Sequence, residues 1–257
     1  MWRVIVLGAI IIGMRFILNV FVLVFLVGCA GPRWVAPADF EYMPILAGQY
    51  EIAAWQKITD YSADAPIYIY IEGDGHAFNA GGRPTTNPTP RGTLVRDMVA
   101  RDTHANVVYI ARPCQYIMSD TCNRHDWTDG RFSPAIVDAM ATAIKTAAAS
   151  HPVVLVGYSG GAMVSGLVIK THPEIVVRRW VTIGGVLNHA AWTAYFGDNP
   201  LTQSMDMSAL PDVPQTHYIG GLDTVVPPEF AREWARAGDI IIVPNATHGD
   251  FGDILIE

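Results

Sequence analysis

The chain has 257 residues, of which 51% are hydrophobic and 16% are charged, and its formal net charge is −7. This length is sufficient for one large globular domain with a substantial core. The acidic balance excludes a nucleic-acid partner and a membrane surface bound through basic side chains, because both require clustered positive charge.

The first 28 residues have a composition of their own. They contain no acidic residue and two basic ones, Arg3 and Arg15. Residues 16–28 form an apolar stretch of signal-peptide length, which is too short to span a bilayer comfortably. The stretch leads into Leu26-Val27-Gly28-Cys29, which resembles the lipobox of bacterial lipoproteins.

This resemblance implies a lipid anchor. Residues 1–28 would be a signal peptide, Cys29 would carry the diacylglycerol, and residues 29–49 would be the lipidated N-terminus and tether. Ala30 stands where an aspartate would favour the inner membrane, which implies the outer membrane of a bacterial cell envelope, facing the periplasm. Cleavage would change the net charge from −7 to −9, because it removes two positive charges and no negative one. The alternative is an uncleaved signal anchor, which a second apolar run at residues 4–13 favours.

Cys114 and Cys122 are the other two cysteines of the sequence. In an oxidising periplasm, a close pair in a loop predicts a disulfide bond. Two free thiols are the alternative. A zinc site is disfavoured because no second pair of ligands follows at a suitable spacing, so we predict no metal site.

From Tyr50 onward, short apolar runs alternate with helical patterns. Residues 50–55 predict an early antiparallel strand. Further strands are expected at residues 66–71, 106–110, 152–156, 180–183, 217–219 and 239–243. Apolar stripes and a Ser-Pro cap predict helices around residues 94–99, from 134 onward, at 160–170 and at 228–237. The alternation predicts an α/β fold, with a mostly parallel central sheet and helices on both faces, over residues 50–257.

The segment Gly157-Tyr158-Ser159-Gly160-Gly161 lies where a predicted buried strand gives way to a helix. A parallel sheet forms its ligand site at the carboxyl ends of its strands. Gly-x-Ser-x-Gly at such a junction is the pattern of a nucleophile elbow, in which glycines prevent collisions in a sharp turn. The N-terminus of the following helix directs its amides and its positive dipole end at the same point.

The chain here resembles the α/β-hydrolase superfamily, and the resemblance covers about residues 50–257. Members of that superfamily carry a catalytic serine, an acid and a histidine in this order. Asp223 follows the predicted strand 217–219 in a Gly-rich turn, and His248 follows the last predicted strand. The resemblance therefore implies Ser159 as nucleophile, Asp223 as the orienting carboxylate and His248 as general base and acid.

Each of these residues also has an ordinary structural explanation. A loop histidine is most often a solvated surface residue, and an aspartate in a Gly-rich turn commonly caps that turn. Asp250 and Asp198 are the alternative acids.

An oxyanion formed on the substrate would need two backbone amides. The resemblance assigns one to Gly160 and the other to the loop Glu72-Gly73-Asp74-Gly75-His76, with Glu72 where lipases and esterases carry histidine. We assign the second amide to Asp74, with Gly75 as the alternative. The carboxylate of Asp74 must then point away from the developing negative charge.

The leading hypothesis is a lipid-anchored serine hydrolase that needs no cofactor and cleaves a small-molecule or lipid-like carboxylic ester. Residues 187–214, where related enzymes carry a lid, are few and predict a minimal one. A peptidase or an acyltransferase with the same three residues is an alternative. A non-catalytic envelope lipoprotein of hydrolase fold is a further one.

Overall fold

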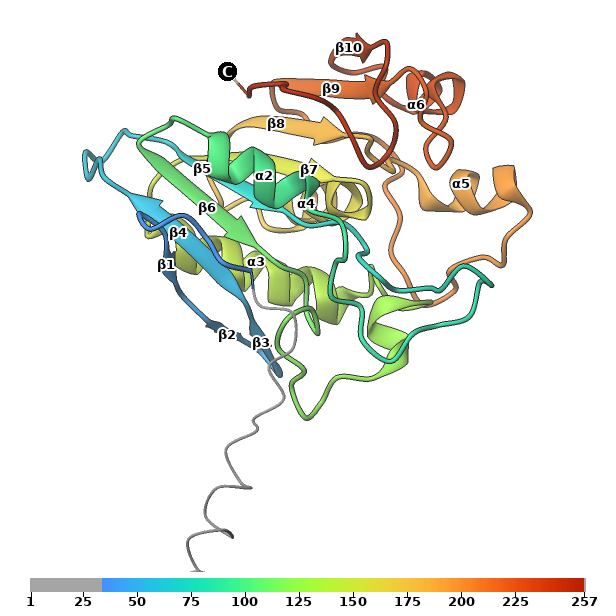
Figure 1. The fold of residues 1–257 in the computed structure, drawn as a ribbon, viewed down its shortest axis with the longest axis horizontal. Coiled ribbons are helices and arrows are strands. Elements are labelled where there is room, and N and C mark those ends of the chain that lie inside the picture. Colours follow the sequence, from blue (N-terminus) through green and yellow to red (C-terminus); the bar gives the residue numbers. More distant parts are fainter. Residues whose placement is uncertain (1–33, 257) are drawn as a thin grey trace, which may run out of the picture. The chain divides into compact units, whose positions relative to one another are not determined.

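The structure, a computed structural model, describes residues 34–256, and the predicted signal peptide and Cys29 lie outside this range. Within it, an eight-stranded sheet has the order β1-β4-β6-β5-β7-β8-β9-β10, and β2 and β3 form a separate pair (Figure 1). The strands are β1 (Glu41–Tyr42), β2 (Ile45–Ala47), β3 (Tyr50–Ile52), β4 (Ala54–Ile58), β5 (Ile67–Ile71), β6 (Asn106–Ile110), β7 (Val153–Tyr158), β8 (Val177–Ile183), β9 (Gln215–Gly220) and β10 (Asp239–Val243). From β6 to β10 in this order, neighbouring strands are parallel. Strand β4 pairs antiparallel with β6, and β1 pairs antiparallel with β4.

Helices cover both faces of the sheet, as predicted. They are α2 (Leu94–Arg101), α3 (Pro134–Ala148), α4 (Gly160–Thr171), α5 (His189–Phe196) and α6 (Pro228–Trp234), with a short 3₁₀ helix η2 (Arg124–Trp127). The connection through α2 runs from β5 outward to β6, whereas those through α3 and α4 run in the opposite direction across the sheet. Because such crossovers are right-handed, α2 lies on one face and α3 and α4 lie on the other (Figure 1).

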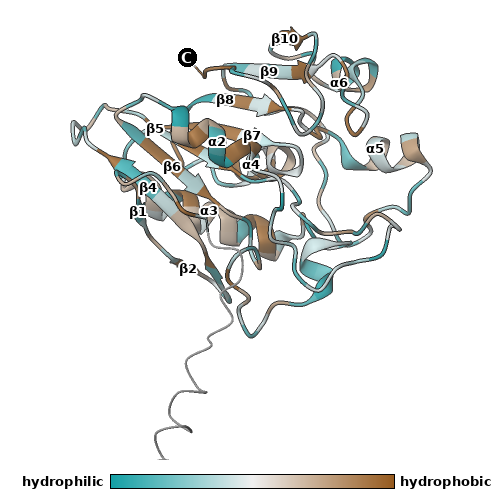
Figure 2. Ribbon diagram, in the orientation of Figure 1, coloured by the Kyte–Doolittle hydropathy of each residue, from teal (hydrophilic) through white to brown (hydrophobic). Residues whose placement is uncertain are grey.

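The core forms around the central strands. Every residue of β6 is buried, and β5 and β7 are buried along most of their length, which explains their nearly continuous apolar sequences (Figure 2). Helix α3 begins as the Ser-Pro pair predicts, since the Ser133 side chain accepts a hydrogen bond from the Ile136 amide. Strand β10, at the edge of the sheet, is less buried, because Ile240 and Ile241 remain about 40% exposed.

The N-terminal part of the sheet differs from the sequence prediction. The run 50–55, expected as one strand, is divided at Ala53 between β3, which pairs with β2, and β4, which pairs antiparallel with β6. Strands β1 and β2 lie within residues 29–49, which were expected to be a tether. Strand β1 therefore adds residues upstream of Tyr50 to the eight-stranded sheet, and β2 adds others to the separate pair.

Residues 187–214 contain the helix α5 followed by irregular backbone, in keeping with the predicted minimal lid. Between residues 34 and 256, no helix has both the length and the apolar character that a bilayer crossing requires.

Candidate active site

Ser159 occupies the sharp turn between β7 and α4, at the carboxyl edge of the sheet. Its backbone has φ 51° and ψ −121°, a conformation that is strained for a residue with a side chain. A Cβ atom on Gly157 would lie 2.6 Å from the Cα of Ala162, and one on Gly161 would lie 2.5 Å from the carbonyl oxygen of Ile71. Both positions thus require glycine, and the turn presents the serine hydroxyl outward.

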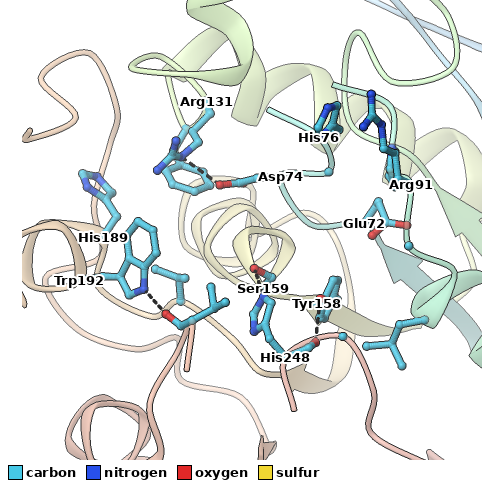
Figure 3. Close-up of a pocket in the computed structure, with 18 residues that line it drawn as sticks. Glu72, Asp74, His76, Arg91, Arg131, Tyr158, Ser159, His189, Trp192 and His248 are labelled. Atoms are coloured by element: carbon cyan, nitrogen blue, oxygen red, sulfur yellow. Dashed lines mark hydrogen bonds and ion pairs between the residues drawn. The ribbon is translucent and has the colours of Figure 1, made fainter. Parts of the chain in front are cut away.

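Three of the predicted side chains form a hydrogen-bonded chain. The Oγ of Ser159 lies 3.0 Å from Nε2 of His248, and Nδ1 of His248 lies 2.8 Å from Oδ2 of Asp223. Figure 3 shows the side chains of Ser159 and His248 pointing toward each other. Both distances fall within ordinary hydrogen-bond range. The structure therefore brings together three residues that lie far apart in the sequence.

Asp223 is fixed independently of the histidine. Its Oδ1 accepts hydrogen bonds of 2.8 Å from the amides of Val225 and Val226, and the residue is 2% exposed. Asp250, one of the alternative acids, instead accepts a hydrogen bond from the amide of Gly252. Asp198, the other alternative, lines a separate cavity. Only Asp223 among the three contacts the His248 side chain within the described chain.

The loop that follows β5 lies directly over the serine. A Cβ atom on Gly73 would be 3.1 Å from the Cβ of Ser159, so the two backbones approach closely. The amides of Asp74 and Gly160 donate no hydrogen bond to a residue within 34–256. A Cβ atom on Gly160 would overlap Oδ1 of Asp74, so the two residues are in contact. Gly75, the alternative to Asp74, makes the turn with φ 65°.

The carboxylate of Asp74 is paired with two arginines. Its Oδ1 lies 2.5 Å from Nη1 of Arg112, and its Oδ2 lies 3.1 Å from Nε of Arg131. Both arginine side chains are almost completely buried. Figure 3 shows the Asp74 carboxylate turned toward Arg131. The pairing compensates the negative charge that would otherwise stand beside Gly160.

Glu72 is a buried anchor for the same loop. Its Oε2 accepts a hydrogen bond of 2.8 Å from the hydroxyl of Tyr109, and its Oε1 accepts one of 3.0 Å from the amide of Gly73. Burial raises the pKa of the Glu72 carboxyl above its ordinary value, although these two hydrogen bonds act in the opposite direction. Glu72 therefore fixes the backbone that presents the Asp74 amide.

The remaining predicted features are the disulfide, the absence of a metal site and the lipidation site. Cys114 and Cys122 form a disulfide with an S–S distance of 2.12 Å. The part of the chain from 34 to 256 contains no group of three or more His, Cys, Asp or Glu side chains suited to a metal ion. Cys29, the predicted lipidation site, is outside that part.

Sequence patterns did not identify three residues that support the site: Tyr158, Arg112 and Arg131. The hydroxyl of Tyr158 donates a hydrogen bond of 2.8 Å to the backbone carbonyl of His248. Arg112 follows the carboxyl end of β6, the strand beside β5. Because ligand sites form at the carboxyl ends of parallel strands, this position could have indicated that Arg112 lies near the site. Arg131 has no comparable signal, because it lies in a loop and is brought to Asp74 by the tertiary fold alone.

A cavity of about 320 Å³ opens at these groups. Ser159, His248, Asp74 and Tyr158 contribute to its wall. The candidate nucleophile is thus accessible to a small molecule.

Comparison with solved structures identifies the fold. A serine hydrolase without a lid from Xanthomonas campestris matches with a TM-score of 0.51 and 13% identity, covering 85% of this chain and 88% of its own. A serine hydrolase homologue from Coxiella burnetii matches with a TM-score of 0.54 and 14% identity, covering 84% and 92%. A putative aryl esterase from Burkholderia cenocepacia matches with a TM-score of 0.56 and 14% identity, covering 81% and 92%.

Comparisons at the sequence level find less. No family model matches the chain, and no curated protein matches it significantly. The similarity is one of fold, and it agrees with the strand order and the helix placement. The chain has the α/β-hydrolase fold.

Proposed function

We propose that this protein is a serine hydrolase that cleaves carboxylic esters through Ser159, His248 and Asp223. The observation that carries the proposal is the continuous hydrogen-bond chain from the serine hydroxyl to the buried carboxylate, with distances of 3.0 and 2.8 Å. A serine hydroxyl becomes a useful nucleophile only when a base accepts its proton, and this arrangement provides that base.

The reaction has two halves. The Oγ of Ser159 attacks the ester carbonyl carbon while its proton passes to Nε2 of His248, and Asp223 stabilises the resulting imidazolium. The tetrahedral intermediate collapses as His248 gives the proton to the departing alcohol oxygen, which leaves an acyl-enzyme. Water then attacks the acyl carbon, its proton passes to His248, and this proton returns to Ser159 as the acid is released.

The developing oxyanion is stabilised by the amides of Gly160 and Asp74. Gly160 is the first residue of α4, so the positive end of the helix dipole adds to its N–H group. The Asp74 carboxylate does not oppose the oxyanion with a full negative charge, because Arg112 and Arg131 pair with it.

The structural neighbours support hydrolysis as the reaction class. They include a serine hydrolase, a putative aryl esterase and a putative dienelactone hydrolase. Residues 187–214 supply helix α5 and irregular backbone beside the site, and a cavity of this size suits a small ester or the acyl end of a lipid-like one.

We also propose that the protein is lipidated at Cys29 and faces the periplasm from the outer membrane. The lipobox-like tetrapeptide and the apolar stretch before it support this proposal. Expression in a bacterial host with labelled palmitate, followed by membrane fractionation, tests it. The label is expected in the membrane protein and is expected to be lost in Cys29→Ser.

The activity is tested with the full chain in detergent. A fluorophosphonate probe is expected to add once to the protein and not at all to Ser159→Ala, as read by intact mass. The 4-nitrophenyl esters of increasing acyl length are then assayed with both proteins. A folded protein that takes up no probe and cleaves no ester would contradict the proposal and favour a non-catalytic lipoprotein.

A further inference from the structure

Arg131 lies where two cavities meet. The cavity at Ser159 has a volume of about 320 Å³, and a second one has about 600 Å³. Three residues line both of them: Asp74, Arg131 and Trp192. A substrate that extends from the serine into the second cavity therefore passes Arg131.

The guanidinium of Arg131 is held in place by its neighbours, but these contacts engage only part of its hydrogen-bond donors within the described chain. Its Nε faces Oδ2 of Asp74 at 3.1 Å, and its carbon lies 5.8 Å from the ring centre of Phe78 and 5.6 Å from that of Phe132. The side chain is 6% exposed. Neither of its terminal nitrogens, Nη1 and Nη2, makes a hydrogen bond with a residue of the described chain. The side chain thus offers the planar pair of donors that binds a carboxylate in bidentate fashion.

Two arginines meet one carboxylate at this position. Arg112 and Arg131 share the single carboxylate of Asp74. Arg91, an exposed residue that also lines the cavity at Ser159, forms no ion pair or hydrogen bond within residues 34–256. The nearby Glu72 is occupied by Tyr109 and by the Gly73 amide. The positive charge is local to these arginines, because the second cavity is also lined by Asp129 and Asp198.

We propose that the substrate is an ester that carries a carboxylate, and that the terminal nitrogens of Arg131 bind this carboxylate while Arg91 adds attraction at the rim. This inference rests on the proposed hydrolase function and specifies its substrate class. Burial makes the contact effective, because a carboxylate bound beside Arg131 is screened little by water. The aromatic neighbours prevent the guanidinium from turning away, so its donors are preorganised.

The test compares charged esters with neutral esters of the same shape. In the first pair, 4-nitrophenyl hydrogen adipate is matched with the 4-nitrophenyl ester of adipamic acid, so that the charge lies on the acyl side. In the second pair, the butyrate ester of 3-hydroxybenzoate is matched with that of 3-hydroxybenzamide, so that the charge lies on the alcohol side. The measured quantity is the ratio of kcat/KM within each pair.

The wild-type protein is expected to prefer the charged member of one pair by about tenfold to hundredfold, the range for a hydrogen bond to a charged group. Arg131→Gln is expected to abolish the preference, Arg131→Lys to retain part of it and Arg91→Gln to reduce it. Arg232→Gln is the matched control, since Arg232 is exposed and lines neither cavity.

If the wild-type protein cleaves the charged and the neutral ester of each pair with the same kcat/KM, the inference is overturned while the hydrolase function stays intact. A preference that survives in folded Arg131→Gln would overturn it as well. If none of the four esters is cleaved and no fluorophosphonate adduct forms, the hydrolase function itself fails, and the inference fails with it. If Arg131→Gln does not fold, Arg131→Lys takes its place, and a wild-type preference that is unchanged in Arg131→Lys would overturn the assignment to Arg131.

Discussion

The hydroxyl of Tyr158 donates a hydrogen bond of 2.8 Å to the backbone carbonyl of His248, and the two rings lie 5.2 Å apart. The residue before the proposed nucleophile therefore holds the loop that carries the proposed base. This contact links β7 directly to the segment after β10, independently of the hydrogen bond between Ser159 and His248.

Tyr158→Phe is expected to lower kcat by up to about tenfold, because a lost hydrogen bond costs about 0.5–1.5 kcal/mol and loosens the position of His248. KM is expected to change little, since the ring remains in the cavity wall. Steady-state kinetics with a 4-nitrophenyl ester measure both constants. Tyr61→Phe is the control, because Tyr61 is 78% exposed and its hydroxyl donates a hydrogen bond to the nearby Ile58 carbonyl. Equal losses in the two variants would refute a specific role for Tyr158.

Gly160→Ala is expected to lower kcat/KM by about 100-fold or more, which is the effect of losing one oxyanion donor. The added methyl group would overlap the Asp74 carboxylate, and this carboxylate cannot move aside without leaving Arg112 and Arg131. The oxyanion donors would therefore be displaced.

Gly81→Ala is the matched control for that substitution. A Cβ atom on Gly81 would meet its nearest neighbour, the Asn79 side chain, only at 3.4 Å. Full activity in Gly160→Ala would mean that the amides of Gly160 and Asp74 do not form the oxyanion site.

The disulfide is expected to contribute about 2–3 kcal/mol to the free energy of unfolding, as the chain-entropy relation gives for a short loop. The two cysteines are separated by 8 positions. Urea unfolding with and without a reducing agent measures this contribution in the wild-type protein. The double variant Cys114→Ser, Cys122→Ser should be insensitive to the reducing agent. A reductant effect of similar size in that variant would show that the disulfide is not its source.

The positions of the three proposed catalytic residues could be predicted because each depends on local sequence. Ser159, Asp223 and His248 each follow an apolar strand, and parallel strands end at one edge of the sheet. The hydrophobic runs also predicted the strands and helices closely enough to identify the fold class.

Contacts between distant segments were not predictable in the same way. Arg131 reaches Asp74 from a loop far along the chain, and no spacing rule connects the two residues. The division of residues 50–55 at Ala53 was missed because a hydrophobic pattern predicts which residues are buried but not where one strand ends and the next begins. Likewise, the apolar sequence of β10 does not reveal that this strand lies at an edge.

His217 is expected to make stability depend on pH. It is 1% exposed, with Nδ1 2.8 Å from the Thr182 hydroxyl and Nε2 3.1 Å from Oε1 of Gln215, and burial lowers its pKa to about 4. Between about pH 6.5 and about pH 4, the imidazole is therefore protonated in the unfolded chain and neutral in the folded one. The free energy of unfolding falls as the pH drops through this range, by up to about 3 kcal/mol. Urea unfolding of the wild-type protein and of His217→Gln at several pH values measures this dependence. The variant is expected to be less stable at neutral pH, and the difference should shrink in acid. A constant difference would mean that His217 is not the titrating group.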